Sequence, residues 1–328
     1  MAVRPTSLPG LRPRSPRTRA RGASSSWPRL DRLGLALCWA AGLLLCLLAA
    51  AIVIYMLVKG LQFMSVGLFT ENPTGDIDQS KAGGFKGPII GTFILTVLGT
   101  VIAVPIGIGC AVWLSEYARP RWLARTVESG VEMVAGTPSI VLALFGVLIF
   151  SQGFFAFASS RSSTGAVFGA SFIAAGVTMS LIALPLIVGA TREALQAIPS
   201  HVREASYALG KTRAATIRRV LLPAARPGMA TGASLGMGRI AGDTAIAVLL
   251  LGITFEFQKV QDVPAPLNYL KGAGSTLTTY VYGNSPAGEG NAPEKAYAAA
   301  FVLLLLVVLL NFGIDLVSRK RKAPSWNV

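Results

Sequence analysis

Long apolar runs dominate this chain, and short polar segments separate them. A helix needs about 20 apolar residues to cross the hydrocarbon of a membrane. Six runs meet this need, and we therefore predict an all-α membrane protein with six transmembrane helices. The predicted spans are Leu33–Val58, Pro88–Leu114, Thr137–Phe157, Ala166–Ala190, Met229–Phe255 and Ala296–Val317.

One polar, basic segment lies between the fourth and fifth apolar runs. Residues Glu204 to Pro223 read EASYALGKTRAATIRRVLLP. The pattern predicts two short helices that are broken at Gly210, because glycine adopts the backbone conformation of a sharp bend. Such a segment, held out of the bilayer, is typical of a docking site for a partner protein.

Composition and charge fit a membrane protein with a defined orientation. The chain is 52% hydrophobic and 14% charged, which is too apolar for one soluble domain of 328 residues. A net charge of +15 raises the possibility of nucleic-acid binding. However, the first 33 residues hold eight of the 30 basic residues and residues 191–228 hold seven, whereas all the alternate loops together hold seven. By the positive-inside rule, we predict a plasma-membrane protein whose two termini and 191–228 loop are cytoplasmic. Anionic lipid headgroups are then the expected partner of the basic residues, and nucleic acid is not.

The chain therefore divides into three parts. Residues 1–32 are rich in Arg, Pro and Ser and are expected to form a disordered basic cytoplasmic arm. Residues 33–318 form the six-span membrane domain, which includes the 191–228 loop, and residues 319–328 form a cytoplasmic tail. The first apolar run is too long for a signal-peptide core, so we predict an uncleaved span. Two long loops, 59–87 and 256–295, are candidate platforms for a partner that arrives from outside.

The fifth span carries two charged residues, Arg239 and Asp243. On a continuous helix they are four residues apart and share a face, which we expect to point into the bundle. Each charge at the bilayer centre costs about 2.5–3.5 kcal/mol on insertion scales, so the pair is expected to have a function. A fixed guanidinium suits a tetrahedral oxyanion. Asp243 would either select an anion that retains a proton, which favours phosphate over sulfate, or orient Arg239. The alternative to an anion site is that Arg239 and Asp243 only neutralise each other.

Glycines recur in the same span, at Gly232, Gly236, Gly238 and Gly242. Small residues at this spacing allow close helix packing. Because these glycines lie beside two charges, we interpret them as the wall of a pathway.

Nothing in the chain predicts covalent chemistry, a metal or a cofactor. Gly210-Lys211-Thr212 resembles the end of a phosphate-binding loop, but Ala205 stands where that motif requires glycine. The single histidine, His201, has no partner at a spacing that is typical of a catalytic or metal site.

The 204–223 segment also carries a resemblance to a known family. Glu204-Ala205-Ser206, then Gly210 and then Val220-x-Leu222-Pro223 resemble the EAA signature of the membrane subunits of ATP-binding-cassette (ABC) importers, with Ser206 for a usual Ala and Val220 for a usual Ile. More narrowly, five motifs resemble the PstA permeases of phosphate importers, with Asp243 where that family more often has Glu. They are Gly83-Gly84-Phe85, Val104-Pro105-Ile106-Gly107, Leu114-Ser115-Glu116-Tyr117, Gly136 to Val141 and Gly238 to Thr244. The sister permease, PstC, is similar enough to remain an alternative.

The resemblance implies a type I ABC importer permease fold and defined partners. These are a second permease subunit in a heterodimer, two cytoplasmic ATPase subunits and an extracytoplasmic phosphate-binding protein. Phosphate would move inward by alternating access, powered by ATP hydrolysis on the partners, so the chain itself is not an enzyme. Arg239, Asp243 and Thr244 would line the substrate pathway. Coupling to the ATPases would fall on the EAA residues Glu204, Ala205, Gly210, Leu222 and Pro223.

Two other functional classes stay open from the sequence. A secondary anion transporter or channel would need ion-coupling residues in its spans and no ATPase-docking loop. A membrane scaffold that reports phosphate status would have no need of a buried Arg239.

Overall fold

The computed structural model describes residues 29–74, 78–80, 83–155, 157–158, 169–252, 270–286 and 288–319. Every regular element in this part of the chain is helical, which confirms the all-α prediction. Most of the predicted N-terminal arm and the tail beyond Arg319 lie outside the described residues. The chain divides into two compact units, residues 1–54 and 55–328.

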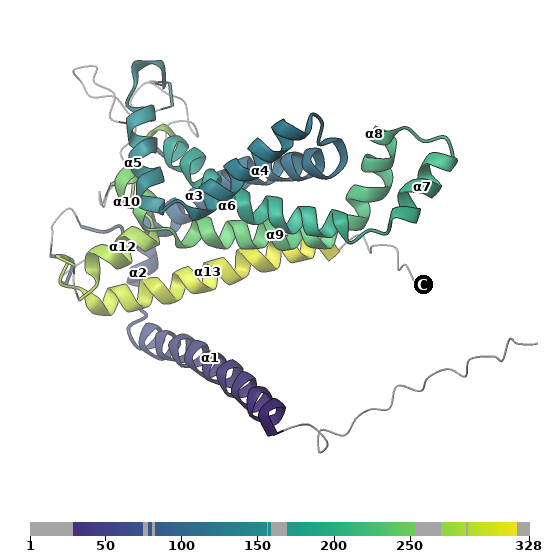
Figure 1. Cartoon of the computed structure of the whole chain (residues 1–328). Coiled ribbons are helices and arrows are strands. Elements are labelled where there is room, and N and C mark those ends of the chain that lie inside the picture. The colour runs from purple at the N-terminus through teal and green to yellow at the C-terminus, as the bar shows by residue number, and fades with distance from the viewer. Residues whose placement is uncertain are drawn as a thin grey trace, which may run out of the picture. The chain divides into compact units, whose positions relative to one another are not determined.

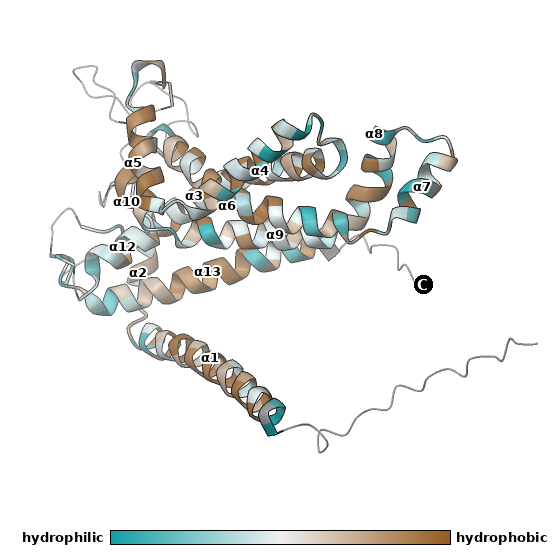
Figure 2. Cartoon of the chain, viewed as in Figure 1, coloured by the Kyte–Doolittle hydropathy of each residue, from teal (hydrophilic) through white to brown (hydrophobic). Residues whose placement is uncertain are grey.

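The first unit contains most of helix α1, Arg29–Gln62. This helix begins four residues before the first predicted span. Its side chains from Leu33 to Ile54 are exposed, and they are apolar on every side (Figure 2). A helix that is hydrophobic all round fits a membrane span.

The second unit holds the remaining helices (Figure 1). Two of the helices continue directly into or out of a π-helical turn, Trp113–Tyr117 after α3 and Ile217–Leu221 before α9. In chain order the helices are α2 Gly67–Thr70, α3 Lys86–Val112, α4 Arg121–Gly136, α5 Ser139–Phe150, α6 Phe172–Gln196, α7 Ser200–Ala208, α8 Arg213–Thr216, α9 Leu222–Gly242, α10 Ala245–Leu251, α12 Leu277–Asn284 and α13 Pro293–Arg319.

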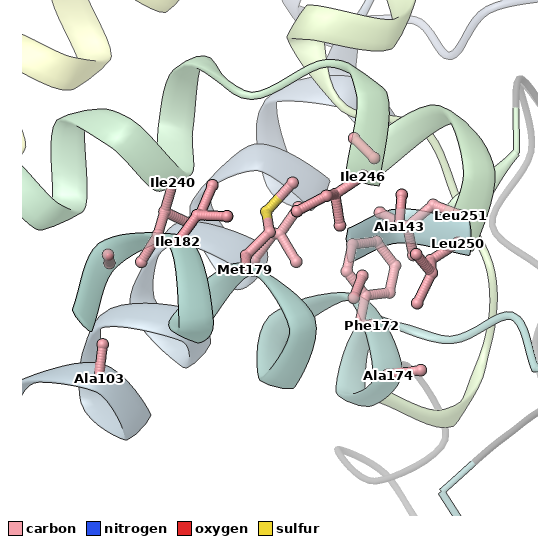
Figure 3. Close-up of a cluster of buried hydrophobic side chains, with 14 of the residues drawn as sticks. Ala103, Ala143, Phe172, Ala174, Met179, Ile182, Ile240, Ile246, Leu250 and Leu251 are labelled. Atoms are coloured by element: carbon pink, nitrogen blue, oxygen red, sulfur yellow. The ribbon is translucent and has the colours of Figure 1, made fainter. Parts of the chain in front are cut away.

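The centre of this unit is formed by α3, α6 and α9, whose backbones approach closely at glycines. A Cβ on Gly236 of α9 would lie 2.9 Å from Ile187 Cγ1 of α6, and a Cβ on Gly232 would lie 3.1 Å from Ala190 Cβ. Met179, Ile182 and Ile240 are among the buried side chains at this contact (Figure 3). The prediction that the glycines form a pathway wall is therefore wrong for Gly232 and Gly236, which serve helix packing. Gly238 and Gly242 have open space around them.

Two of the six predicted spans are not single long helices, and each belongs to a pair of helices that is bent at a break. Four single helices are long and apolar enough to cross a membrane: α1, α3 together with its π turn, α6 and α13. The predicted third span, Thr137–Phe157, contains α5, which has 12 residues and is too short to cross a membrane alone; the preceding α4 meets it at an angle of 108°. Pro138 explains this break, because proline disfavours the helical conformation of the residue before it, and Thr137 is extended with ψ of 130°.

The fifth span consists of α9 and α10, which meet at 58°. The break falls at Asp243 and Thr244, where Asp243 is extended with φ of −80° and ψ of 119°. The apolar run continues through this point, so hydropathy alone predicts no interruption. The break lies in the part of the chain that we predicted to hold the substrate site.

The second predicted external loop is partly buried in its described part. Residues 272–276 are buried, and the Phe172 amide donates a hydrogen bond to the Gly272 carbonyl at 3.2 Å. This segment leads into α12, whose residues are also largely buried.

Candidate functional site

The predicted docking segment forms a helix–turn–helix tip at one end of the second unit (Figure 1). Helix α7 ends at Ala208, and Gly210 follows with φ of +73°. The Gly210 amide donates to the Tyr207 carbonyl at 2.9 Å, and the Lys211 amide donates to the Ser206 carbonyl at 3.2 Å. These two bonds define a Schellman motif, which stops a helix by placing glycine in the left-handed conformation. The predicted break at Gly210 is confirmed.

The two short helices of the tip are also joined by side chains. The hydroxyls of Ser206 on α7 and Thr216 on α8 lie 2.8 Å apart and are buried. Thr212 caps α8, because its hydroxyl accepts a hydrogen bond from the Ala215 amide. The tip is therefore one small, internally bonded body.

The outer surface of the tip combines apolar and acidic side chains. Glu204, Ala205, Tyr207 and Leu209 are exposed, and Leu209 is 78% exposed. Figure 2 shows that the rest of α7 and α8 is largely hydrophilic. A fully exposed leucine on such a surface fits an apolar pocket of a partner.

Leu222 and Pro223 lie away from this surface. They form the first turn of α9 and are partly buried, and Leu222 packs against the cluster that contains Leu195 and Val202. The structure therefore brings together only Glu204, Ala205 and Gly210 of the five predicted coupling residues. Leu222 and Pro223 stand where the tip joins the membrane helix.

Replacing Gly210 by alanine is expected to weaken the turn. A left-handed residue with a Cβ costs about 1 kcal/mol, and no neighbouring atom lies within 4 Å to add a clash. Hydrogen exchange of the Gly210 and Lys211 amides should become about fivefold faster, since 1.4 kcal/mol corresponds to a factor of ten. Asparagine tolerates this conformation better and serves as the control. Unchanged protection in the alanine variant would contradict the assignment.

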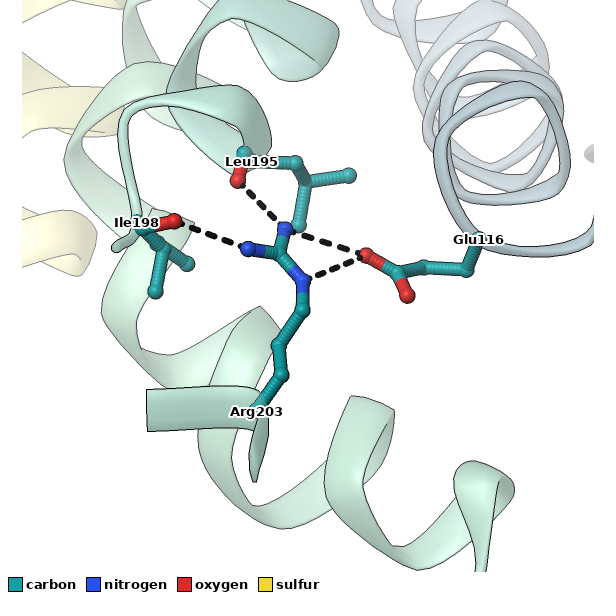
Figure 4. A network of polar contacts seen from close by, with 4 residues as sticks. All are labelled: Glu116, Leu195, Ile198 and Arg203. Atoms are coloured by element: carbon teal, nitrogen blue, oxygen red, sulfur yellow. Dashed lines mark hydrogen bonds and ion pairs between the residues drawn. The ribbon is translucent and has the colours of Figure 1, made fainter. Parts of the chain in front are cut away.

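A polar network beneath the tip was not predicted from the sequence. Arg203 of α7 donates to Glu116 Oε1 from Nε at 3.2 Å and from Nη2 at 3.1 Å (Figure 4). The same guanidinium donates to the carbonyls of Ile198 and Leu195, each at 2.8 Å. Glu116 is 87 residues away in the sequence, so no local pattern reveals this contact.

Arg239 lies on an uncovered stripe of α9. The exposed residues Pro227, Thr231, Leu235 and Arg239 repeat every four positions, while the other faces of the helix are packed against α3, α6 and α13. Arg239 itself is exposed, so it does not point into the packed core of its own chain as we predicted. Among the described residues, its guanidinium has no hydrogen bond or ion pair.

Asp243 is separated from Arg239 by the end of α9. Its side chain is buried, and Oδ1 accepts a hydrogen bond from the Ile246 amide at 3.0 Å, which caps α10. The prediction that Arg239 and Asp243 share one helical face is therefore wrong, because the helix ends between them. Thr244 is half-buried at the same break and opens α10, where its carbonyl accepts from the Val248 amide.

In the described residues no group of three His, Cys, Asp or Glu side chains is close enough to hold a metal ion. The arrangement offers a predicted docking tip at one end and, beside a break in a membrane helix, a guanidinium that is unpaired among the described residues.

Comparison with known proteins defines the class. Residues 103–323 match the family of binding-protein-dependent transport system inner membrane components, and the chain belongs to this family. It is thus a permease subunit of an ABC importer and a multi-pass membrane protein, not an enzyme.

Individual relatives narrow the comparison. The chain is 31% identical over 294 residues to the probable ABC transporter permease YqgH of Bacillus subtilis, covering 86% of this chain and 89% of that protein. It is 30% identical over 262 residues to the phosphate transport system permease PstA 1 of Mycobacterium tuberculosis, covering 79% and 78%. Over a shorter stretch of 181 residues it is 33% identical to PstC of Pasteurella multocida, covering 51% and 56%.

Solved structures support the fold. A chain of a bacterial ABC transporter involved in the import of alginate aligns with a TM-score of 0.59 at 16% identity, covering 89% of this chain and 98% of that one. A chain of the MetNI methionine transporter aligns with a TM-score of 0.52 at 23% identity, covering 71% and 92%. The predicted type I importer permease fold is confirmed.

Proposed function

We propose that this chain is one half of the translocation pathway of an ATP-driven importer of inorganic phosphate, in the position of a PstA-type permease. Similarity at about 30% identity to phosphate transport permeases over most of the chain supports this substrate. Inward movement by alternating access would be powered by ATP hydrolysis on partner chains.

The observation that carries the proposal is Arg239 on α9, which is exposed and has no hydrogen bond or ion pair in the described part of the chain. It lies about 15 Å along the helix from Met229, where the predicted fifth span begins, at 1.5 Å per residue. This distance corresponds to about the middle of a hydrocarbon layer that is about 30 Å thick. A charge that faced lipid at this depth would be costly, so Arg239 is expected to face protein or water. A second permease subunit packed along the Pro227–Arg239 stripe would enclose Arg239 in a pathway, where a guanidinium binds a tetrahedral oxyanion through two parallel hydrogen bonds.

The proposal includes the following partners. A second permease of the same family would complete the pathway as a heterodimer. The α7–α8 tip, together with the basic residues around it, would face the cytoplasm and dock on one of two ATPase subunits. An extracytoplasmic phosphate-binding protein would deliver the substrate to the opposite end.

The alternatives fit the observations less well. In a secondary anion transporter or channel, the exposed Leu209 and Glu204 of the tip would have no function. In a membrane scaffold, Arg239 would have no function. The PstC position in the same importer remains the second candidate, because PstC permeases are also similar to this chain.

Reconstitution of the complex tests the proposal. The chain would be assembled in liposomes with a second permease, the ATPase subunits and a phosphate-binding protein. We expect uptake of radioactive phosphate that requires ATP and stops when the nucleotide site of the ATPase is inactivated. Uptake driven by a proton or sodium gradient alone would favour the secondary transporter.

The role of Asp243 can be separated from that of Arg239. Asparagine at this position keeps an oxygen that can cap α10, whereas alanine loses the cap at a cost of about 1 kcal/mol. We therefore expect Asp243→Asn to retain assembly and phosphate uptake, and Asp243→Ala to reduce both. The measurement is phosphate uptake with and without competing sulfate. Loss of discrimination against sulfate in Asp243→Asn would show that the carboxylate selects the substrate in addition to capping the helix.

A further inference from the structure

We propose that the Arg203–Glu116 pair is the positioning link that passes movement of the docking tip to the membrane helices. This inference rests on the proposed function, because it concerns how the same subunit is driven. It assigns roles to two residues outside the EAA signature and outside the substrate pathway.

The position of Arg203 makes it suited to this role. It lies in the middle of α7, directly before the exposed Glu204, and its own side chain is only 22% exposed. Thus one turn of α7 presents Glu204 to a partner and turns Arg203 toward the bundle. Any displacement of α7 by the partner must displace the guanidinium as well.

The guanidinium holds three elements at once (Figure 4). It bonds to the carbonyl of Leu195 in the last turn of α6 and to the carbonyl of Ile198 just beyond the end of that helix. It also bonds through two nitrogens to Glu116, in the π turn that ends α3. A planar group with several fixed donors is rigid, so the contact sets the orientation of α7 as well as its distance.

Glu116 has few other ways to compensate its charge. Its side chain is 5% exposed, although it lies at the basic end of the unit. A buried carboxylate requires a paired cation, and Arg203 is the cation with which it forms an ion pair in the described part of the chain. The pair therefore breaks only at a high cost, as a link that transmits force requires.

The helices that receive this movement lead to the pathway. A Cβ on Gly107 of α3 would lie 2.7 Å from Ile187 of α6, and Gly236 of α9 meets the same isoleucine. Ile240, the neighbour of Arg239, packs within 3.1 Å of the Cβ position of Gly99 on α3. Close-packed backbones of this kind shift together. Movement of the ends of α3 and α6 would thus reach Arg239.

A second ion pair, between α6 and α4, supplies a matched control. Arg192 of α6 pairs with Glu128 of α4, with side chains that are 37% and 33% exposed. This pair does not involve α7, so its loss should leave the link between the tip and the membrane helices intact. Glu116→Gln and Glu128→Gln are the same chemical change at the two pairs.

The test measures coupling in the reconstituted complex. For each variant, we would determine capture of the ATPase subunits, the rate of ATP hydrolysis and the phosphate taken up per ATP hydrolysed. We expect Glu116→Gln to assemble and to hydrolyse ATP, with at least a tenfold loss of phosphate per ATP. Glu128→Gln should match the unmodified complex. Unchanged phosphate per ATP in an assembled Glu116→Gln complex would overturn the inference.

A double variant separates positioning from folding. Glu116→Gln with Arg203→Gln leaves no unpaired buried charge, so assembly should be retained even if a single variant fails to assemble. The inference predicts that phosphate per ATP stays low in this double variant. Recovery of coupling together with assembly, or failure of the double variant to assemble, would identify the pair as a purely structural element.

A readout that does not depend on the substrate distinguishes this inference from the proposed function. Gly242 beside Arg239 is exposed and open, so a cysteine there reports the accessibility of the pathway once Cys38, Cys46 and Cys110 are replaced. ATP should change its alkylation rate in the parent complex, and this change should be lost in Glu116→Gln. A complex that shows the ATP-dependent change but imports no phosphate would refute the proposed substrate and leave the link intact. An ATP-dependent change that persists in Glu116→Gln would refute the link.

Discussion

Replacing Arg239 by alanine is expected to reduce ATP-driven phosphate uptake roughly 10- to 150-fold, because a hydrogen bond to a charged group contributes about 1.5–3 kcal/mol. The guanidinium is exposed on α9 and unpaired among the described residues, so its removal breaks no contact within the chain. Folding and assembly should therefore be retained. The measurement is uptake of radioactive phosphate together with ATP hydrolysis that is stimulated by the loaded binding protein.

Two further variants sharpen this prediction. Arg239→Lys keeps the charge but loses the planar fork, so we expect an intermediate uptake. Thr231→Ala changes the same exposed stripe two turns earlier, where the hydroxyl already donates to the Pro227 carbonyl at 3.0 Å, and should have little effect. Normal uptake by an assembled Arg239→Ala complex would remove the anion pathway from the proposal.

The apolar pattern predicts the helical class and the approximate position of each span, but it does not predict where a span bends. Thr137 begins one apolar run and Asp243 lies within another, and both residues are extended. At Thr137 the following proline is a visible signal. At Asp243 the signal is weaker, because an aspartate inside a span is as compatible with a charge pair as with a helix cap. The four-residue spacing from Arg239 therefore suggested a shared face that the structure does not have.

The docking tip was predictable because its determinants are local. The amides of Gly210 and Lys211 end α7 by bonding to carbonyls three and five positions earlier, respectively, and such contacts follow from the sequence alone. The network of Arg203 depends instead on Glu116, which reaches it only when α3 and α6 pack. The positions of Leu222 and Pro223 were also not predictable, since their place in the EAA signature does not reveal that they lie at the base of the tip.

Replacing Leu209 by aspartate is expected to weaken capture of the ATPase subunits by about 30-fold, since burying a leucine contributes about 2 kcal/mol. Leu209 is 78% exposed and directly precedes Gly210, so it is the most prominent apolar side chain of the tip. The substitution alters no internal contact of the Schellman motif, which uses the backbone. The measurement is capture of the purified ATPase by the permease in detergent, followed by ATP-driven uptake.

Glu204 gives a second, independent measurement of the same surface. Glu204→Gln removes the charge that would meet a basic residue of the ATPase, and an exposed or partly exposed charge pair of this kind contributes about 0.2–1 kcal/mol. We therefore expect a smaller loss of capture than for Leu209→Asp, and one that diminishes at high salt because surface charges are screened. Glu289→Gln is the matched control, because Glu289 is an exposed acid that follows α12, at the other end of the second unit (Figure 1). If capture is unaffected by Leu209→Asp and by Glu204→Gln, the α7–α8 tip is not the ATPase contact, and the force that drives the permease must enter elsewhere.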